Sequence, residues 1–103
     1  MKDFSTRLVR AAKVTDMTTS DLARWFDRPR ATVNTWLLGR VPWGPQAKLA
    51  NKRLVLLELS ISSRKKYWPV PSALSWAKRE KYVRGMRDDA ERHHRVPDMR
   101  ATA

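Results

Sequence analysis

Apolar residues recur at the spacing of an α-helix along most of this chain, and nowhere do apolar and polar residues alternate as in a half-buried strand. Prolines and glycines break the pattern at a few points, most of them between Pro29 and Pro71. The chain has 103 residues, a length typical of one small domain. The sequence therefore predicts an all-α fold, a compact bundle of about five helices.

The helix boundaries follow from capping residues and from the apolar spacing. We expect helices over residues 4–14, 18–26, 29–38, 45–62 and 73–94. Thr18 and Asp21 have the spacing of a capping box at the start of the second helix. Gly39 suits the residue that ends the third helix, and Ser72 can cap the fifth. The last residues, 95–103, are expected to form a frayed tail.

The charge of the chain indicates its class of partner. Lys and Arg number 22 against 10 Asp and Glu, which gives a formal net charge of +12. Such an excess predicts a polyanionic partner, and nucleic acid is the commonest one. The absence of cysteine excludes thiolate metal sites and disulfides. An acidic membrane surface is the rival partner, but no long amphipathic basic helix with an aromatic apolar face stands out and no apolar run is long enough to span a bilayer, so we expect no membrane partner.

The segment from Thr18 to Gly39 combines two short helices with different faces. Leu22 and the small Ala23 let the two helices cross closely, while Val33, Trp36 and Leu37 would anchor the second helix on the first. Opposite this anchor, the second helix carries Arg30, Ala31, Asn34, Thr35 and Leu38. An anchored helix with hydrogen-bonding groups on its outer face is typical of a helix-turn-helix, whose second helix enters the major groove of DNA.

These residues, TTSDLARWFDRPRATVNTWLLGRVP, resemble the lambda-repressor-like (Cro/repressor) helix-turn-helix family over about the first half of the chain. The resemblance assigns core positions to Leu22, Ala23, Val33 and Trp36, and DNA-facing positions to Arg30, Ala31, Asn34, Thr35 and Leu38. It implies a phage or bacterial protein of the cytoplasm, in a bacterium or a phage-infected host cell. The turn departs from the family, because Asp27 replaces the usual glycine, Arg28 replaces an apolar residue and Pro29 replaces the capping serine. Aspartate visits the left-handed region more readily than most residues, so Asp27 is a tolerable replacement for the glycine. Asp27 can also supply the cap that Pro29 lacks.

Each candidate base contact has a plainer alternative. Asn34 can pair with the N6/N7 edge of adenine, which is worth about 1–3 kcal/mol of discrimination, or it can be a solvated or phosphate-contacting side chain. Arg30 can reach guanine or a phosphate. Thr35 can contact a phosphate or a thymine methyl group, or be a tolerated surface residue. Leu38 can meet a thymine methyl group, although packing beneath the loop after the helix is favoured.

Basic residues outside this face are candidates for phosphate contacts. Arg24, Arg28 and Arg40 flank the segment, and Arg64, Lys65 and Lys66 precede the aromatic pair Tyr67-Trp68. The fifth helix adds five basic residues, Lys78, Arg79, Lys81, Arg84 and Arg87. We expect about half of these to form a solvated face, paired in part with Glu80, Asp88 and Asp89.

Apolar residues outside the segment suggest how the rest of the chain packs. Trp36 and Trp76 are expected in the core, while Trp43 and Trp68 lie in proline-bounded loops, where they either cap the core or form an interface. The fifth helix would face inward with Leu74, Ala77, Val83 and Met86. The fourth is apolar on two sides, and its second stripe is a candidate homodimer seam unless the fifth helix covers it. This stripe comprises Leu49, Leu56 and Leu59.

Together these features predict a helix-turn-helix DNA-binding domain over 1–62 and a basic helical extension with a tail over 63–103. The extension either packs on the first part or serves oligomerisation. No phosphate loop, paired catalytic carboxylates, nucleophile–base set or metal-ligand spacing is visible, so we expect neither an enzyme nor a cofactor. The leading hypothesis is a small transcriptional regulator that binds double-stranded DNA sequence-specifically through residues 29–38. The alternatives are a DNA-recognition or assembly subunit of a larger phage nucleic-acid complex, as in genome packaging, and an RNA-binding accessory protein.

Overall fold

The computed structural model describes residues 3–94, and within them it contains five α-helices, two short 3-10 helices and no strand. The all-α prediction is therefore confirmed. The elements, in chain order, are α1 (Phe4–Thr15), α2 (Thr19–Phe26), α3 (Arg30–Leu37), η1 (Gly44–Gln46), α4 (Ala47–Ser63), η2 (Lys65–Tyr67) and α5 (Trp76–His93). The tail predicted over 95–103 lies outside the described residues.

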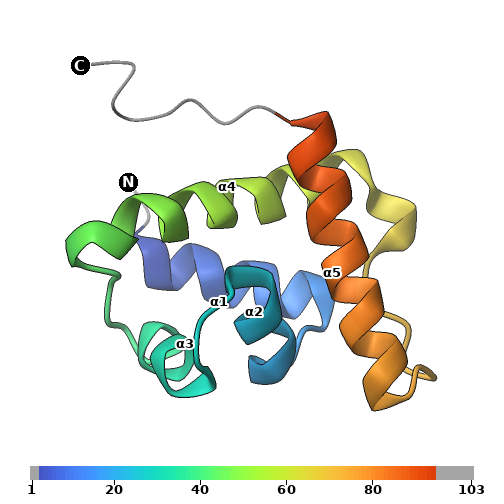
Figure 1. Ribbon diagram of the computed structural model, residues 1–103, viewed down its shortest axis with the longest axis horizontal. Coiled ribbons are helices and arrows are strands. Elements are labelled where there is room, and N and C mark those ends of the chain that lie inside the picture. The colour runs from blue at the N-terminus through green and yellow to red at the C-terminus, as the bar shows by residue number, and fades with distance from the viewer. Residues whose placement is uncertain (1–2, 95–103) are drawn as a thin grey trace.

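α1 and α4 pack against each other, and the remaining helices are arranged around them (Figure 1). α3 packs on α1 and α2 towards one end of the long axis of the molecule. α5 packs on α2 and α4 towards the other end, where it crosses α4 steeply (Figure 1). This arrangement leaves one side of α3 without a neighbouring helix among the described elements.

Local capping explains most helix ends. The predicted capping box of α2 is present: the Thr18 hydroxyl accepts from the Asp21 amide at 3.1 Å, and the Thr18 amide donates to the Asp21 carboxylate at 2.9 Å. The prediction that Ser72 caps the fifth helix is wrong. Ser75 caps it instead, because the chain turns at residues 72 and 73 and the Leu74 amide donates to the Pro71 carbonyl. α5 therefore begins at Trp76 rather than at Ala73.

The connection between α2 and α3 depends on one left-handed residue. Asp27 ends α2 with φ 53°, and its amide donates to the carbonyls of Ala23 and Arg24. The prediction that Asp27 also caps α3 is wrong, because no side chain caps this helix and Pro29 occupies its N-cap position. Gly39 follows α3 with φ 115°, a conformation that residues with a side chain rarely adopt.

A single hydrophobic core joins all five helices. Phe4, Phe26 and Trp36 meet edge to face, with ring centroids 5.3–6.1 Å apart. A second aromatic set consists of Trp25, Trp68 and Tyr82, again in edge-to-face contact. Such pairs add to the free energy gained by burying their surface. Residues on both sides of the predicted boundary after Ser62 share this core, which continues through Trp68, Val70, Val83 and Ala90.

Several predictions of burial are wrong, and the later start of α5 explains part of the difference. Trp76 is 60% exposed because it is the first residue of α5, at the edge of the bundle. Ala77 is also exposed, whereas the inward positions predicted for Leu74, Val83 and Met86 are confirmed, with Leu74 packing on the core from just before the helix. Trp68 takes a core position instead, with its indole N–H donating to the Ser60 hydroxyl at 3.0 Å.

The predicted dimer seam on α4 is not a continuous exposed stripe. Leu56 is 1% exposed and belongs to the core of the chain itself. Leu59 is half-buried, and Leu49 is 47% exposed. The prediction of a seam through these three leucines is therefore wrong for Leu56, because neighbouring parts of the same chain already cover it.

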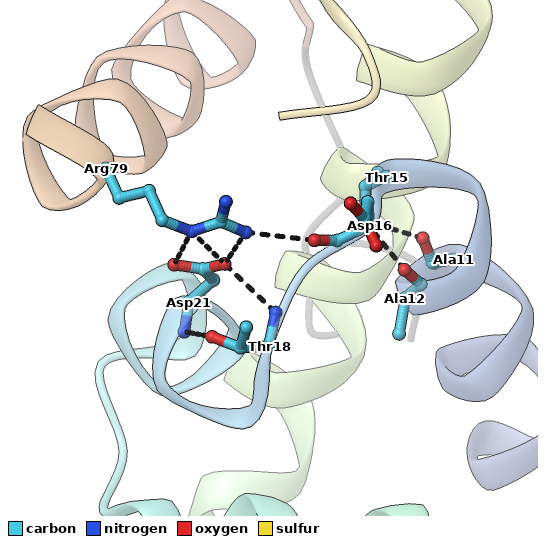
Figure 2. Close-up of polar contacts among 7 residues, drawn as sticks. All are labelled: Ala11, Ala12, Thr15, Asp16, Thr18, Asp21 and Arg79. Carbon is cyan, nitrogen blue, oxygen red and sulfur yellow. Dashed lines mark hydrogen bonds and ion pairs between the residues drawn. The ribbon is translucent and has the colours of Figure 1, made fainter. Parts of the chain in front are cut away.

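A buried ion pair ties α5 to the start of α2 (Figure 2). The Asp21 carboxylate, which is 1% exposed, accepts from the Arg79 guanidinium at 2.5 and 3.0 Å. Arg79 also donates to the Asp16 carbonyl at 2.9 Å. The bond to Asp21 raises the pKa of Arg79 above its ordinary value. Asp21 thus serves both the capping box and the contact between two helices.

A second ion pair predicts a pH dependence of stability. Arg64 donates to Asp89 at 3.0 Å and holds the pKa of this carboxyl below its ordinary value of 3.8. Asp89 therefore stabilises the fold above that pH, and the contribution is lost as the pH falls through the lowered value. Asp89→Asn should reduce the free energy of unfolding at pH 7 by up to about 1 kcal/mol, because both side chains are partly exposed.

Urea unfolding at several pH values measures this difference. The gap between Asp89→Asn and the unmodified protein should close as the pH falls through the lowered pKa of Asp89, because both proteins then carry a neutral side chain at this position. Asp88→Asn, which changes an exposed neighbour, should produce a much smaller gap. A gap for Asp89→Asn that stays constant down to pH 2 would contradict the assignment.

Candidate nucleic-acid interface

The outward face of α3 carries all five residues predicted to contact bases. Arg30, Ala31, Asn34, Thr35 and Leu38 are all exposed. Val33 and Trp36, on the opposite side of the helix, are 0% and 4% exposed. Because the two buried residues fix the rotation of the helix, its outward side chains leave the protein in one defined direction.

Leu38 differs from the prediction that it packs beneath the following loop. It is 78% exposed. Its position explains this exposure, since Leu38 follows Ala31 and Asn34 at helical spacing and continues their face to the end of the helix. The outward surface of α3 therefore ends in an apolar side chain.

A groove runs between α3 and the loop that follows it. Ala31, Thr35 and Arg40 line this groove, together with Arg28 and Trp36. The loop side is formed by residues 39–43, of which Val41 and Trp43 are 52% and 84% exposed. The Thr35 hydroxyl donates to the Thr32 carbonyl at 2.6 Å, so its methyl group and oxygen lone pairs remain for other contacts.

The start of α3 is suited to a negative charge. No side chain caps this helix end, and its first turn holds no acidic residue. The amide groups of a first helical turn have no partner within the helix, and the helix dipole places partial positive charge there. Arg30, the first residue of α3, adds a full charge at the same end.

A second hollow lies on the other side of this helix start, towards α5. Arg28 and Arg30 line it together with Arg24, Arg84 and Arg87. Arg24, predicted as a phosphate contact, is only 16% exposed because its guanidinium lies 3.7 Å from Glu80 and 4.6 Å from the centroid of the Trp76 ring. Arg84 and Arg87 are among the five basic residues of the fifth helix, about half of which were expected to form a solvated face. Nothing in the sequence shows that this side of α5 meets the α2–α3 connection.

Two guanidinium groups, those of Arg87 and Arg53, meet the carboxyl end of α2. Arg87 donates to the carbonyls of Arg24 and Trp25 at 3.2 and 3.3 Å, and Arg53 donates to the Phe26 carbonyl. These contacts satisfy carbonyl groups that the helix itself leaves free. The pKa of Arg53 is lowered, mainly by burial and secondly by the positive charge of Arg87. The arginines at this junction are therefore close enough to repel one another.

The remaining predicted phosphate contacts lie elsewhere. Arg64, Lys65 and Lys66 follow α4, and Figure 1 places this segment at the opposite end of the molecule from α3. The side chain of Arg64 is bonded to Asp89, whereas Lys65 and Lys66 are exposed, and the Lys66 ammonium lies 5.3 Å from the Tyr67 ring centroid. The structure thus divides the predicted phosphate contacts between two separate surfaces.

Neither a metal centre nor a membrane-spanning helix was found in residues 3–94. No group of three or more His, Cys, Asp or Glu side chains within this range could hold a metal ion. None of the helices described there combines the length and the apolar character needed to cross a bilayer. The chain matched no protein-family model, and comparisons with curated proteins and with solved structures gave no match either.

Proposed function

We propose that this protein binds double-stranded DNA sequence-specifically, as a small transcriptional regulator. In this proposal α2 and α3 form a helix-turn-helix, and α3 with Leu38 enters the major groove. The observation that carries the proposal is the division of α3 into two faces. Its buried Val33 and Trp36 fix the helix, and its outward side presents Arg30, Asn34 and Thr35.

The chemistry of the outward face suits the base edges of the major groove. The Asn34 amide can donate to N7 and accept from N6 of adenine only if it is held at a fixed angle, which the anchor provides. The apolar Ala31 and Leu38 suit contact with thymine methyl groups. The net charge of +12 and the uncapped start of α3 would supply the salt-dependent attraction to phosphates.

Selection of bound sequences from a random duplex pool, at a stated salt concentration, tests the proposal. An enriched motif is the expected result. Because a single helix reads few base pairs, we expect the motif to contain two half-sites and the protein to bind it as a dimer. A pool without enrichment would contradict sequence-specific binding.

Replacing Asn34 by alanine should separate specific from nonspecific binding. We expect the affinity for the selected duplex to fall by about 1–3 kcal/mol, or about 5- to 150-fold, with little change for random duplexes. Asn51→Ala is a matched control, because Asn51 is exposed on α4 and donates to the Ala47 carbonyl of its own helix. Fluorescence anisotropy with both duplexes measures the effect. An equal loss on the two duplexes would contradict base reading by Asn34.

One observation favours the second candidate, a DNA-recognition or assembly subunit of a larger complex. Leu38, Val41 and Trp43 are exposed apolar side chains at the end of α3 and in its following loop. Exposed apolar side chains gathered in one short segment are typical of a surface that contacts another protein. Mass measurement of the protein on its DNA distinguishes the candidates, since a dimer supports regulation and a larger ring or mixed assembly supports the second.

A further inference from the structure

Five arginines from three parts of the chain line one open pocket. The pocket has a volume of about 620 Å³ and lies between α2, the start of α3 and the part of α5 from Trp76 to Arg87. Its arginines are Arg24, Arg28, Arg30, Arg84 and Arg87. Asp27 is the one acidic residue in its lining. Such a concentration of guanidinium groups requires a source of negative charge.

The acidic side chains near the pocket do not balance this charge. Glu80 lies 2.9 Å from Arg84 and 3.7 Å from Arg24, so one carboxylate serves two arginines. Glu91 lies 3.7 Å from Arg87, beyond hydrogen-bond distance. Within residues 3–94, no ion pair is formed by Arg28 or by Arg30. The cluster therefore keeps an excess of positive charge.

The hydrogen-bonding capacity of the cluster is also incompletely used. Three nitrogens have no partner although they are shielded from solvent: Nη1 of Arg24, Nε of Arg28 and Nε of Arg87. Arginine stays protonated in proteins, so these groups cannot relieve their mutual repulsion by losing a proton. The charges of Arg87 and Arg28 also contribute to the lowered pKa of Arg53 next to the pocket. An anion in the pocket would relieve both the repulsion and the missing hydrogen bonds.

We propose that this pocket binds a phosphate group. Guanidinium groups form paired hydrogen bonds with phosphate oxygens, and arginines that converge from three elements suit a tetrahedral anion better than a flat carboxylate. The start of α3 supports the same choice, because Pro29 and Arg30 line the pocket and no side chain caps this helix. The Arg24 guanidinium lies over the Trp76 ring, 4.6 Å from its centroid, and both residues line the pocket.

The position of the pocket favours the DNA backbone as the source of this phosphate. This assignment rests on the proposed function. The pocket adjoins the first residue of the proposed reading helix. A phosphodiester held there would fix α3 relative to the strand that flanks its reading face, with α5 supplying Arg84 and Arg87 from the far side. A free phosphate or a nucleotide is the other source of the same chemistry.

The test compares Arg28→Gln with Arg10→Gln, which removes the same charge from an exposed position on α1 that does not line the pocket. Inorganic phosphate is titrated into each protein while the Nε–H resonances of the arginines are followed by NMR. In parallel, the affinity for a random-sequence duplex is measured at several salt concentrations. Arg84→Gln serves as a second variant, because its side chain is 64% exposed and its replacement leaves the core unchanged.

Saturable shifts of the Arg28 and Arg87 resonances with phosphate support the site if both are retained in Arg10→Gln and the Arg87 shift is abolished in Arg28→Gln. If the source is DNA, Arg28→Gln and Arg84→Gln also reduce the salt slope by about 0.9 each, more than Arg10→Gln does. Phosphate binding without any DNA binding supports the site with a free anion as its ligand, although the proposed function then fails. Resonances that do not saturate, with equal DNA affinities for Arg28→Gln and Arg10→Gln, would overturn the proposal.

Discussion

Replacing Asp21 by alanine should lower the free energy of unfolding by about 3–5 kcal/mol, because the substitution leaves the charge of Arg79 without its partner in a largely buried position. Arg79 is 14% exposed, and its other described partner is the Asp16 carbonyl. The same substitution removes the acceptor of the Thr18 amide, which breaks the capping box of α2. Both losses act at the junction of α2 and α5, so this part of the bundle should loosen first.

Denaturant unfolding measures the loss, and two variants interpret it. Asp88→Ala removes the same charge from an exposed position on α5 and should change the stability by no more than about 0.5 kcal/mol. Asp21→Asn keeps an acceptor for the Thr18 amide but loses the charge. Its loss of stability should therefore lie between those of Asp21→Ala and Asp88→Ala. A loss for Asp21→Ala no larger than that for Asp88→Ala would contradict a structural role for the ion pair.

The elements of this fold that were predictable depend on local chemistry. The capping box of Thr18 and Asp21 needs only two residues at a fixed spacing, and the end of α3 needs only Gly39. The start of α5 was not predictable in the same way, because Ser72 and Ser75 are both competent caps. The turn from Pro71 to Leu74 decides between them. That decision also placed Trp76 at the surface.

The candidate site, too, was predictable only where it depends on local sequence patterns. Helical spacing alone separates Arg30, Ala31, Asn34 and Thr35 from Val33 and Trp36, so the exposure of these four residues was predicted correctly, whereas Leu38 was expected beneath the loop. The arginine pocket was not predicted, because it depends on which side of α5 packs against α2. Ion pairs between distant residues escape local patterns for the same reason: Arg24 meets Glu80, and Arg64 meets Asp89. Which acidic residue pairs with a given basic residue depends on how the helices pack, and local sequence patterns do not show this.

The second large effect concerns the anchor of α3. Trp36→Ala should lower the free energy of unfolding by about 3–5 kcal/mol, the usual range for removing a buried tryptophan side chain. Trp36 is 4% exposed, and its ring lies 5.3 Å from that of Phe4 and 5.5 Å from that of Phe26, in edge-to-face contacts. Trp36→Phe keeps an aromatic ring in this cluster and should cost less than half as much.

Trp43→Ala provides the matched control, because it makes the same substitution in a side chain that is 84% exposed. Its effect on stability should stay within about 0.5 kcal/mol. If the anchor fixes the outward face of α3, Trp36→Phe should also reduce the preference for the selected duplex over random duplexes at a temperature where it is fully folded. Similar stabilities for Trp36→Ala and Trp43→Ala would show that Trp36 does not hold α3. A stable Trp36→Phe with unchanged sequence preference would instead show that base reading does not require this anchor.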